Sequence, residues 1–445
     1  MDTPSPIAQI NHPINPNPLK NRRGLVSWCL YDAANSAFPT VITTFIFGAY
    51  FTQAIAETPE SGAADWGLAI GLSGAAVAIA SPLLGAVADR GGRRKPWLAL
   101  LTALCVFATA MLWFAEPNSG NTIWALFFVA LGLFGFELGM VFYNAMLSDL
   151  APAKFLGRLS GWGWGCGYIG GLVCLALSLV GFVQTETPWF GVPMEAAQNI
   201  RAVAVLTAVW FAVLSLPLFL FTPDRAATGL SFGAAARDGM GQIAETFRHA
   251  REYKGLGRYL LAHMIYADGL NTLFAFGGIY AAGAFGMSLS EVIQFGIALN
   301  VTAGLGAMAF AWVDDRIGAK PVVVIALLAL IMFSTGLLLV ESKALFWMFG
   351  MGLGVFVGPA QAASRSLMVG LSPPDMQTEM FGLYALSGKA TAFAGPLLVG
   401  AVTAAFDSQR AGMAVIVVFF VAGLILLLPV REPRPNPSDG NGASR

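Results

Sequence analysis

Four ionisable side chains lie at overlapping depths inside long apolar stretches of the chain: Asp32, Glu137, Asp268 and Lys389. Charged groups inside a membrane-spanning segment are costly, and they mark substrate or ion pathways by default. One ammonium group can neutralise only one of three carboxylates, and burial beside a like charge favours the protonated form of an acid. This set predicts solute binding or proton coupling. The alternative is a static ion pair in which Lys389 bridges to Asp32 or Asp268.

Hydrogen-bonding side chains accompany the charged set. An asparagine follows Asp32 by three residues and another follows Asp268 by three, so each pair shares one helix face. Nearby tyrosines add hydroxyl groups and aromatic faces for a polar ligand, although polar contacts between helices would explain any single one equally well. The candidate substrate and proton-coupling residues are Tyr31, Asp32, Asn35, Glu137, Tyr266, Asp268, Asn271, Tyr384 and Lys389.

A basic loop, Gly-x-x-x-Asp-Arg-x-Gly-Arg-Arg, follows the second apolar stretch, and a degenerate copy occurs 226 residues later. A carboxylate at a helix end can cap a neighbouring helix and pair with arginine, and such contacts break when domains rotate. The copy has Ala319 and Pro321 in place of a second basic pair, so we expect a weaker latch there. The alternative is a plain basic loop. Arg365, near its helix end, is expected to form a gate pair, with Asp149 as its counterpart. The candidate gate residues are Gly85, Asp89, Arg90, Gly92, Arg93, Arg94, Asp149, Asp315, Arg316, Gly318, Lys320 and Arg365.

The elements that position these residues are membrane helices. Of 445 residues, 56% are hydrophobic and only 11% are charged, whereas soluble domains carry roughly 25% charged residues. A single soluble globule is therefore excluded, and the long continuous apolar segments favour helices over a membrane barrel. Twelve spans are predicted, at 25–53, 66–88, 97–115, 121–147, 157–183, 200–222, 257–285, 289–313, 321–340, 344–370, 379–405 and 412–430.

The two halves of the chain repeat each other. The Asp-x-x-Asn pattern recurs at an offset of 236, the basic loop at 226, and a Pro, Gly, Gly series beginning at Pro152 recurs at 221 from Pro373. This order predicts two parallel six-helix halves with a site between them. The expected units are a tail at 1–24, a half at 25–222, a linker at 223–256, a half at 257–430 and a tail at 431–445.

Charge predicts the orientation of these helices. With both termini on the cytoplasmic side, the segments on that side hold 20 of the 25 Lys and Arg residues and the opposite loops hold 3. The linker is expected to form an amphipathic helix on the membrane surface, the alternative being a solvated connection. Its apolar stripe would be Met240, Ile243, Phe247, Ala250 and Tyr253.

Other classes of function find little support. The net charge of zero implies no nucleic-acid partner, and the four cysteines lie in apolar segments, where they are expected to pack rather than form disulfides. No Cys/His cluster has metal-ligand spacing, and no nucleophile–base constellation is evident. We therefore expect neither an enzyme nor a cofactor or metal.

The basic loop, from Gly85 to Pro96, resembles that of the major facilitator superfamily between its second and third helices. Four further stretches resemble the branch that contains the vacuolar amino-acid effluxers of autophagy and their bacterial relatives: 28–38, 143–147, 361–367 and 381–389. The resemblance implies a rocker-type secondary transporter that exports small solutes, with amino acids as one candidate cargo. The expected partners are the lipid bilayer, a small-molecule substrate and protons. The short loops suggest a bacterial form, monomeric in the cytoplasmic membrane. Alternatives are a drug or lipid-linked sugar exporter, or a membrane sensor that does not transport.

Overall fold

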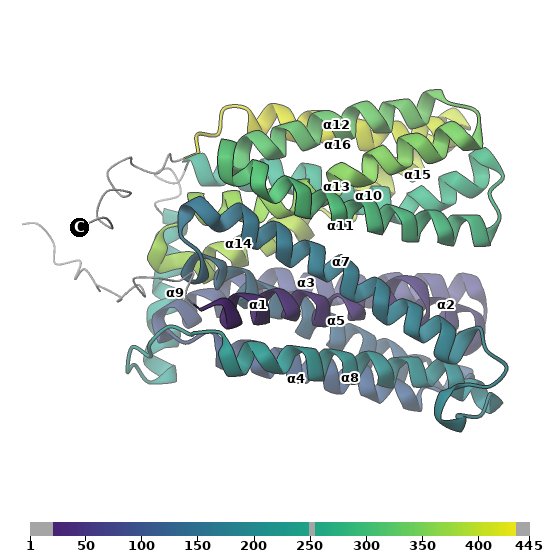
Figure 1. Ribbon diagram of the computed structural model, residues 1–445, viewed down its shortest axis with the longest axis horizontal. Helices are drawn as coiled ribbons and strands as arrows, with labels where there is room; N and C mark the ends of the chain where they lie inside the picture. The colour runs from purple at the N-terminus through teal and green to yellow at the C-terminus, as the bar shows by residue number, and fades with distance from the viewer. Residues whose placement is uncertain (1–20, 249–253, 433–445) are drawn as a thin grey trace, which may run out of the picture.

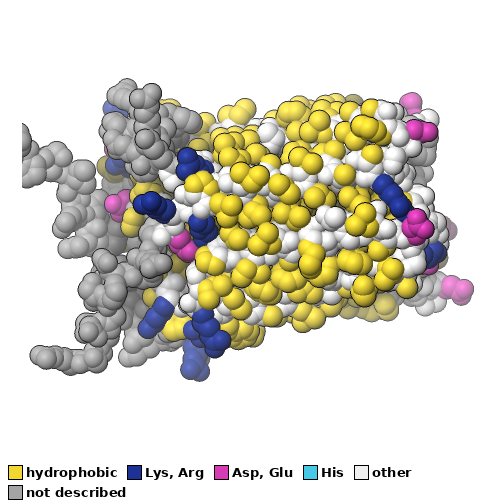
Figure 2. All heavy atoms as spheres, turned by 90° about the horizontal axis from the view of Figure 1, so that it is seen from above, with side chains coloured by type: hydrophobic (Ala, Val, Ile, Leu, Met, Phe, Trp, Pro, Cys, Tyr) yellow, Lys and Arg dark blue, Asp and Glu magenta, His cyan; other side chains and the backbone are white. Residues whose placement is uncertain are grey.

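The computed structural model describes residues 21–248 and 254–432, and no strand occurs among them. Eleven helical segments of this part are long and apolar enough to cross a membrane, and α10 (Lys254–Phe285) adds a twelfth long helix of 32 residues. Figure 2 shows hydrophobic side chains covering the middle of the visible face, with charged side chains at its two ends. This apolar band is what a bilayer requires of a spanning bundle. The predicted all-helical membrane fold is thus confirmed.

The first half is built from the first six spans. The first span contains α1 (Arg22–Asn35), a π-helical segment Phe38–Phe45, α2 (Phe47–Tyr50) and a second π-helical segment Phe51–Ile55. The following spans are α3 (Pro59–Gly91), α4 (Lys95–Met111), α5 (Thr122–Ala145) continued by α6 (Leu147–Leu150), α7 (Leu156–Ser178) and α8 (Gln198–Phe221). The predicted span 25–53 is therefore an irregular helix rather than a uniform one.

The second half follows α9 (Phe232–Arg248) and begins with α10. It continues with α11 (Leu289–Ile317), α12 (Ala319–Leu339), α13 (Lys343–Leu371), α14 (Gln377–Ala390), α15 (Ala394–Phe406) and α16 (Gln409–Leu427). The predicted single span 379–405 is interrupted, because residues 391–393 form a turn between α14 and α15. Figure 1 shows the two halves stacked side by side, with α7 running along the boundary.

The linker helix α9 lies against α3 at the end of the bundle where the described chain begins and ends (Figure 1). We call this the terminal end. Ala235 is buried on α9, and Gln242 donates a hydrogen bond to Glu379 of α14. Met240 of the predicted apolar stripe is 58% exposed, so it is not on the face that packs against the bundle. The described side chains do not include those of Ile243 and Phe247, and Ala250 and Tyr253 lie outside the described residues.

The two halves contact each other mainly toward the terminal end. α3 packs against α14, and α7 packs against α11 and α13. Ser81 of α3 donates to the backbone oxygen of Gly382 at 3.0 Å, and Ser160 of α7 donates to that of Ala362 at 2.7 Å. By contrast, α15, the later half of the same span as α14, packs chiefly against α10 and α16 of its own half. The interface is therefore closed at the terminal end.

Candidate functional site

The basic loop after α3 joins the two halves at the terminal end. The Asp89 carboxylate accepts a 2.6 Å hydrogen bond from the Thr378 hydroxyl and a 2.9 Å bond from the backbone N–H of Glu379. Both donors lie in the first turn of α14, whose free N–H groups and dipole favour a negative charge. Asp89 of the first half therefore caps a helix of the second half, which is a contact that domain separation must break.

Arg94 is the buried centre of the same loop, with 1% of its side chain exposed. Its guanidinium lies 3.3 Å from Asp89 and 2.5 Å from Asp149, and its Nε donates to Thr378 at 2.8 Å. Asp149 also pairs with Arg225 at 2.8 Å. The predicted pairing of Asp149 with Arg365 is therefore wrong: Asp149 sits among the basic groups at the terminal end, whereas Arg365 turns toward the interior.

The second copy of the loop also crosses between halves. The Asp315 carboxylate pairs with the Arg158 guanidinium of α7 and accepts its backbone N–H at 3.1 Å. Lys320 donates to the backbone oxygen of Leu428 at 2.7 Å, within its own half. Gly92 and Gly318 end their helices with φ of 84° and 95°, the left-handed region that favours glycine. The remaining basic candidates have exposed side chains at this end: Arg90, Arg93 and Arg316.

A second contact between halves lies deeper, where the Arg365 side chain of α13 passes α7 and reaches Asp32 of α1. Nη1 of Arg365 is 3.3 Å from Oδ2 of Asp32, and both side chains are nearly fully buried. The same guanidinium donates to Ser160 at 2.9 Å and to Asn144 at 3.1 Å, and its carbon lies 4.9 Å from the centre of the Trp28 ring. Such a network satisfies a buried charge through hydrogen bonds and cation–π contact.

Lys389 of α14 pairs with Glu137 of α5, with Nζ 2.6 Å from Oε1. The partner of Lys389 is thus neither of the two aspartates considered from the sequence. The exposed fractions of the two side chains are 29% and 22%, compared with 2% and 5% for Arg365 and Asp32. This pair joins the halves where its charges remain accessible to a solute.

Asp268 of α10 stands apart from both cations. Its Oδ2 accepts the backbone N–H of Gly395 at 3.2 Å, at the start of α15, while its Oδ1 is buried without a hydrogen-bond partner among the described residues. The Thr272 hydroxyl, one helical turn further along, is buried and unpartnered in the same part of the chain. A Cβ on Gly395 would lie 1.9 Å from this hydroxyl and 3.1 Å from Oδ1, so only glycine permits the approach. The helix break therefore faces two unsatisfied oxygens.

The remaining candidates have mainly structural partners. Tyr31 bonds Thr102 at 2.7 Å within the first half, and Tyr266 bonds Ser364 at 2.7 Å within the second. Asn35 is buried, and its amide donates to the sulfur of Met140. The ring of Tyr384 stacks on His263 with centroids 3.9 Å apart, and Asn271 is exposed. In the described residues, no group of three or more His, Cys, Asp or Glu side chains could hold a metal ion.

Several residues of the site were not assigned from the sequence. Thr378 was missed because a threonine carries no signal of its own, and Arg158 because it looks like any basic residue after a short loop. Trp28, Tyr143 and Asn144 lie in the stretches on which the family resemblance rests, and they meet around Arg365 and Asp32: Tyr143 stacks on Trp28 and donates to Asp32 at 3.0 Å. Those stretches were the signal that could have located them.

Comparison with known proteins gives a consistent result. Residues 67–436 match the family described as Vacuole effluxer Atg22 like. The uncharacterized MFS-type transporter YxiO of Bacillus subtilis (strain 168) is 27% identical over 409 residues, which cover 91% of this chain and 94% of that protein. Autophagy-related protein 22 of Cryptococcus neoformans var. neoformans serotype D (strain B-3501A) is 25% identical over 294 residues, 61% of this chain but only 52% of the fungal protein.

Solved structures share the architecture. The proton:xylose symporter XylE, bound to 6-bromo-6-deoxy-D-glucose, superposes with a TM-score of 0.71 at 13% identity, covering 94% of this chain and 97% of that one. The human organic anion transporter MFSD10 gives 0.67 at 16% identity, covering 92% and 99%. At such low identity the likeness concerns the fold alone, and the fold is that of the major facilitator superfamily.

Proposed function

This chain belongs to the Atg22-like family of the major facilitator superfamily, and we propose that it is a proton-coupled transporter that exports a small polar solute. Membership supports secondary transport as the class of activity. The proposal of proton coupling and of a polar cargo rests on how the charges of the interior are paired.

The observation that carries proton coupling is the distribution of two cations among three carboxylates. Arg365 pairs with Asp32, and Lys389 pairs with Glu137. Asp268 has no cationic partner among the described residues: one carboxylate oxygen accepts a backbone N–H, and the other has no hydrogen-bond partner in that part of the chain. An unpaired buried carboxylate is costly when ionised and far less so when protonated. A protonated Asp268 can also donate a hydrogen bond, and the orphan Thr272 hydroxyl is a suitable acceptor nearby. We infer that Asp268 carries the coupled proton.

The cargo class is supported by the Glu137–Lys389 pair. Both side chains of this pair are partly exposed, so a solute can reach them. The Glu137 carboxylate can bind the positive group of a zwitterion such as an amino acid, and the Lys389 ammonium group can bind its negative group. A lipophilic drug or a lipid-linked sugar is the alternative cargo, and a drug would suit a mainly apolar cavity better. The accessible ion pair therefore favours a small polar or zwitterionic solute.

The closed terminal end supports alternating access. If both termini are cytoplasmic, as the Lys and Arg distribution suggests, the contacts of Asp89, Arg94 and Arg158 close the cytoplasmic side in this conformation. We propose that the halves rock about the central site and that these contacts break in the inward-open state. The membrane would be the bacterial cytoplasmic membrane.

The decisive experiment uses full-length protein in liposomes with an imposed pH gradient. The cargo is first found by screening amino acids, sugars and dyes in everted vesicles. D268N should lose accumulation driven by the pH gradient and keep exchange of solute at equal concentrations, because neutralisation mimics the protonated acid. Glu341→Gln, which alters an exposed acid at the opposite end, should leave both activities intact. Undiminished accumulation by D268N would refute proton coupling at this residue, and accumulation that follows a sodium gradient instead would assign the coupling to sodium.

A further inference from the structure

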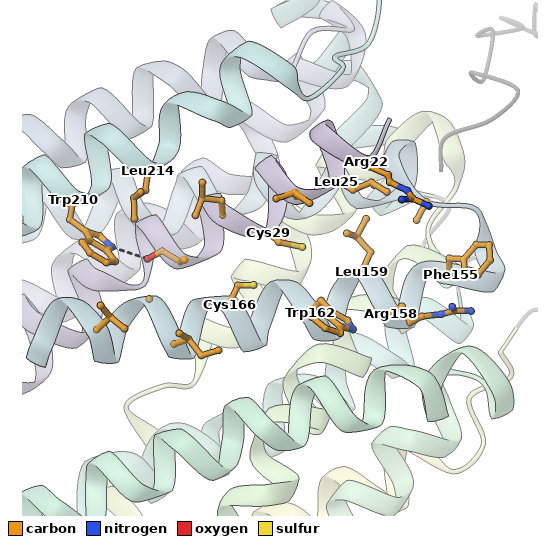
Figure 3. A pocket seen from close by; sticks show the side chains of 17 residues that line it. Arg22, Leu25, Cys29, Phe155, Arg158, Leu159, Trp162, Cys166, Trp210 and Leu214 are labelled. Carbon is orange, nitrogen blue, oxygen red and sulfur yellow. Dashed lines mark hydrogen bonds between the residues drawn. The ribbon is translucent and has the colours of Figure 1, made fainter. Parts of the chain in front are cut away.

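A groove of about 880 Å³ runs along the outer side of the first half, between α1 and α7 with α8 behind it. Figure 3 shows its lining side chains, with Cys29 and Cys166 pointing toward each other and two arginines at one end. Small residues line the groove where α1 and α7 lie together, namely Cys29, Ala33, Cys166 and Gly170, and we call this part of the lining the floor. The groove lies apart from the Arg365–Asp32 and Lys389–Glu137 pairs, and it shares only Arg158 with the pair that this residue forms with Asp315.

The groove opens toward the bilayer. Three of its lining side chains have large exposed fractions on the apolar band of the molecule: Val26 with 66%, Ile169 with 52% and Trp162 with 42%. Exposed apolar surface of this kind would contact hydrocarbon in a membrane. An occupant that enters from this side must therefore be at least partly apolar.

The length of the groove suits a lipid chain. On α1 it extends from Arg22 to Ala33, and on α7 from Arg158 to Val173. At a rise of about 1.5 Å per residue these stretches are about 16 Å and about 22 Å long. The hydrocarbon of one leaflet is about 15 Å deep, half of the core thickness. The groove therefore runs from the interface at the terminal end to the depth that an acyl chain of that leaflet reaches.

The positive charge at the arginine end of the groove favours a negatively charged headgroup. Two arginines and no carboxylate line the groove. Arg22 is exposed, and Arg158 keeps 42% of its side chain exposed while its Nε bonds to Asp315. Within the described residues its two terminal nitrogens have no hydrogen-bond partner. Lys154 adds a further positive charge, 5.2 Å from the centre of the Phe155 ring, which also lines the groove. Guanidinium groups bind phosphate in bidentate fashion.

From this combination we propose that the groove binds an anionic phospholipid of the leaflet at the terminal end. The phosphate lies between Arg22 and Arg158, and an acyl chain lies along the floor past Cys29 and Cys166. The first 20 residues of the chain are a poor occupant, because they are rich in Pro, Asn and other polar residues and could not replace an acyl chain in hydrocarbon.

The test measures retention of phosphatidylglycerol and phosphatidylcholine by purified full-length protein, using native mass spectrometry with titrated lipid. The unaltered protein should retain phosphatidylglycerol preferentially. Arg22→Gln should weaken that binding about fivefold, since one arginine near an anionic surface contributes on that scale. Arg23→Gln is the matched control: it removes the same charge from the next residue, which is exposed but does not line the groove. Arg158 is left unchanged because it also holds Asp315.

Two further arms separate the headgroup from the chain. Cys166→Phe, which fills the floor, should abolish the preference, and glycerophosphoglycerol, which has the same phosphate without chains, should not compete. A measurement on the unaltered protein covers the case in which the filled variant fails to fold: phosphatidylglycerol, but not phosphatidylcholine, should slow labelling of Cys29 and Cys166 by a membrane-permeant maleimide. The proposal would be overturned if both lipids were retained equally, or if Arg22→Gln and Arg23→Gln had equal effects. It would also be overturned if the rate of cysteine labelling changed only when residues 2–18 were removed or when a lipophilic dye was added.

Discussion

Arg365 of α13 reaches across the boundary between the two halves and places its Nη1 3.3 Å from the Asp32 carboxylate of α1. The two side chains are 333 residues apart in the chain, and both are buried. The hydroxyl of Tyr143 donates to the carboxylate of the pair, and the amide oxygen of Asn144 accepts from its guanidinium. Because each half contributes one charge, neither can move away without exposing the other charge or finding it a new partner.

Asp32→Asn should destabilise the protein strongly. It leaves the Arg365 guanidinium buried without its counter-charge, and removal of one partner of a buried ion pair costs about 3 kcal/mol or more. We expect a clearly lower midpoint of thermal unfolding in detergent. Glu291→Gln is the control, since it weakens an exposed pair with Lys343 while glutamine can still serve the helix cap. Equal midpoints for the two variants would show that the Asp32–Arg365 pair does not hold the halves together.

Gly85→Ala should open the terminal end. A Cβ at this position would lie 2.5 Å from the backbone oxygen of Thr378, so α3 and α14 must separate. Such overpacking costs about 1–3 kcal/mol. In a cysteine-free background, spin labels at the exposed positions 90 and 375 should report a longer distance or a new long-distance population. Gly91→Ala, on the same helix with nothing within 4 Å of its Cβ, should leave the distribution unchanged. An unchanged distribution in Gly85→Ala would contradict the latch.

Glu137→Gln and Lys389→Gln should impair transport more than folding. Each removes one charge from a pair that is partly exposed, so we expect only a small shift in the unfolding midpoint. If the pair binds a zwitterion, the half-saturating solute concentration should rise about tenfold, the scale of one hydrogen bond to a charged group. Lys343→Gln, which breaks an exposed pair, is the control. An unchanged half-saturating concentration in both variants would remove the pair from the binding site.

Fusions to a reporter that is active only outside the cytoplasm test the orientation. The excess of Lys and Arg in the segments on the side of the termini predicts that a fusion after Arg445 is silent. A fusion after Asn118, in the connection between α4 and α5, should be active because that connection lies at the opposite end. Activity in the first fusion and silence in the second would reverse the proposed membrane orientation.

The sequence by itself determined the helical membrane class and the family. Hydrophobic runs long enough to span a bilayer are visible in one dimension, because each backbone polar group in lipid must be satisfied within its own helix. The basic loop containing Asp89 and Arg94 was likewise recognisable, since a glycine, a carboxylate and arginines at constant spacing surround one helix end. The sequence also identified Asp32, Glu137, Asp268 and Lys389 as unusual, because few ionisable groups occur within the spans.

Only the tertiary structure decided which of these groups meet. Counting residues along a helix estimates the depth of a side chain, but it does not determine the tilt of the helix or the direction in which the side chain points. Errors of a few residues in depth were enough to pair Arg365 with Asp149 in the prediction, whereas the structure pairs it with Asp32. The partner of Lys389 and the isolation of Asp268 depend on the break between α14 and α15 and on how α14 packs against α3 and α5. The contacts of Arg365 with Asp32 and of Lys389 with Glu137 join residues 333 and 252 apart and are set by packing across the two halves. Gly395 meets Asp268 from 127 residues away through packing of α15 against α10 within the second half. No local sequence pattern encodes any of these contacts.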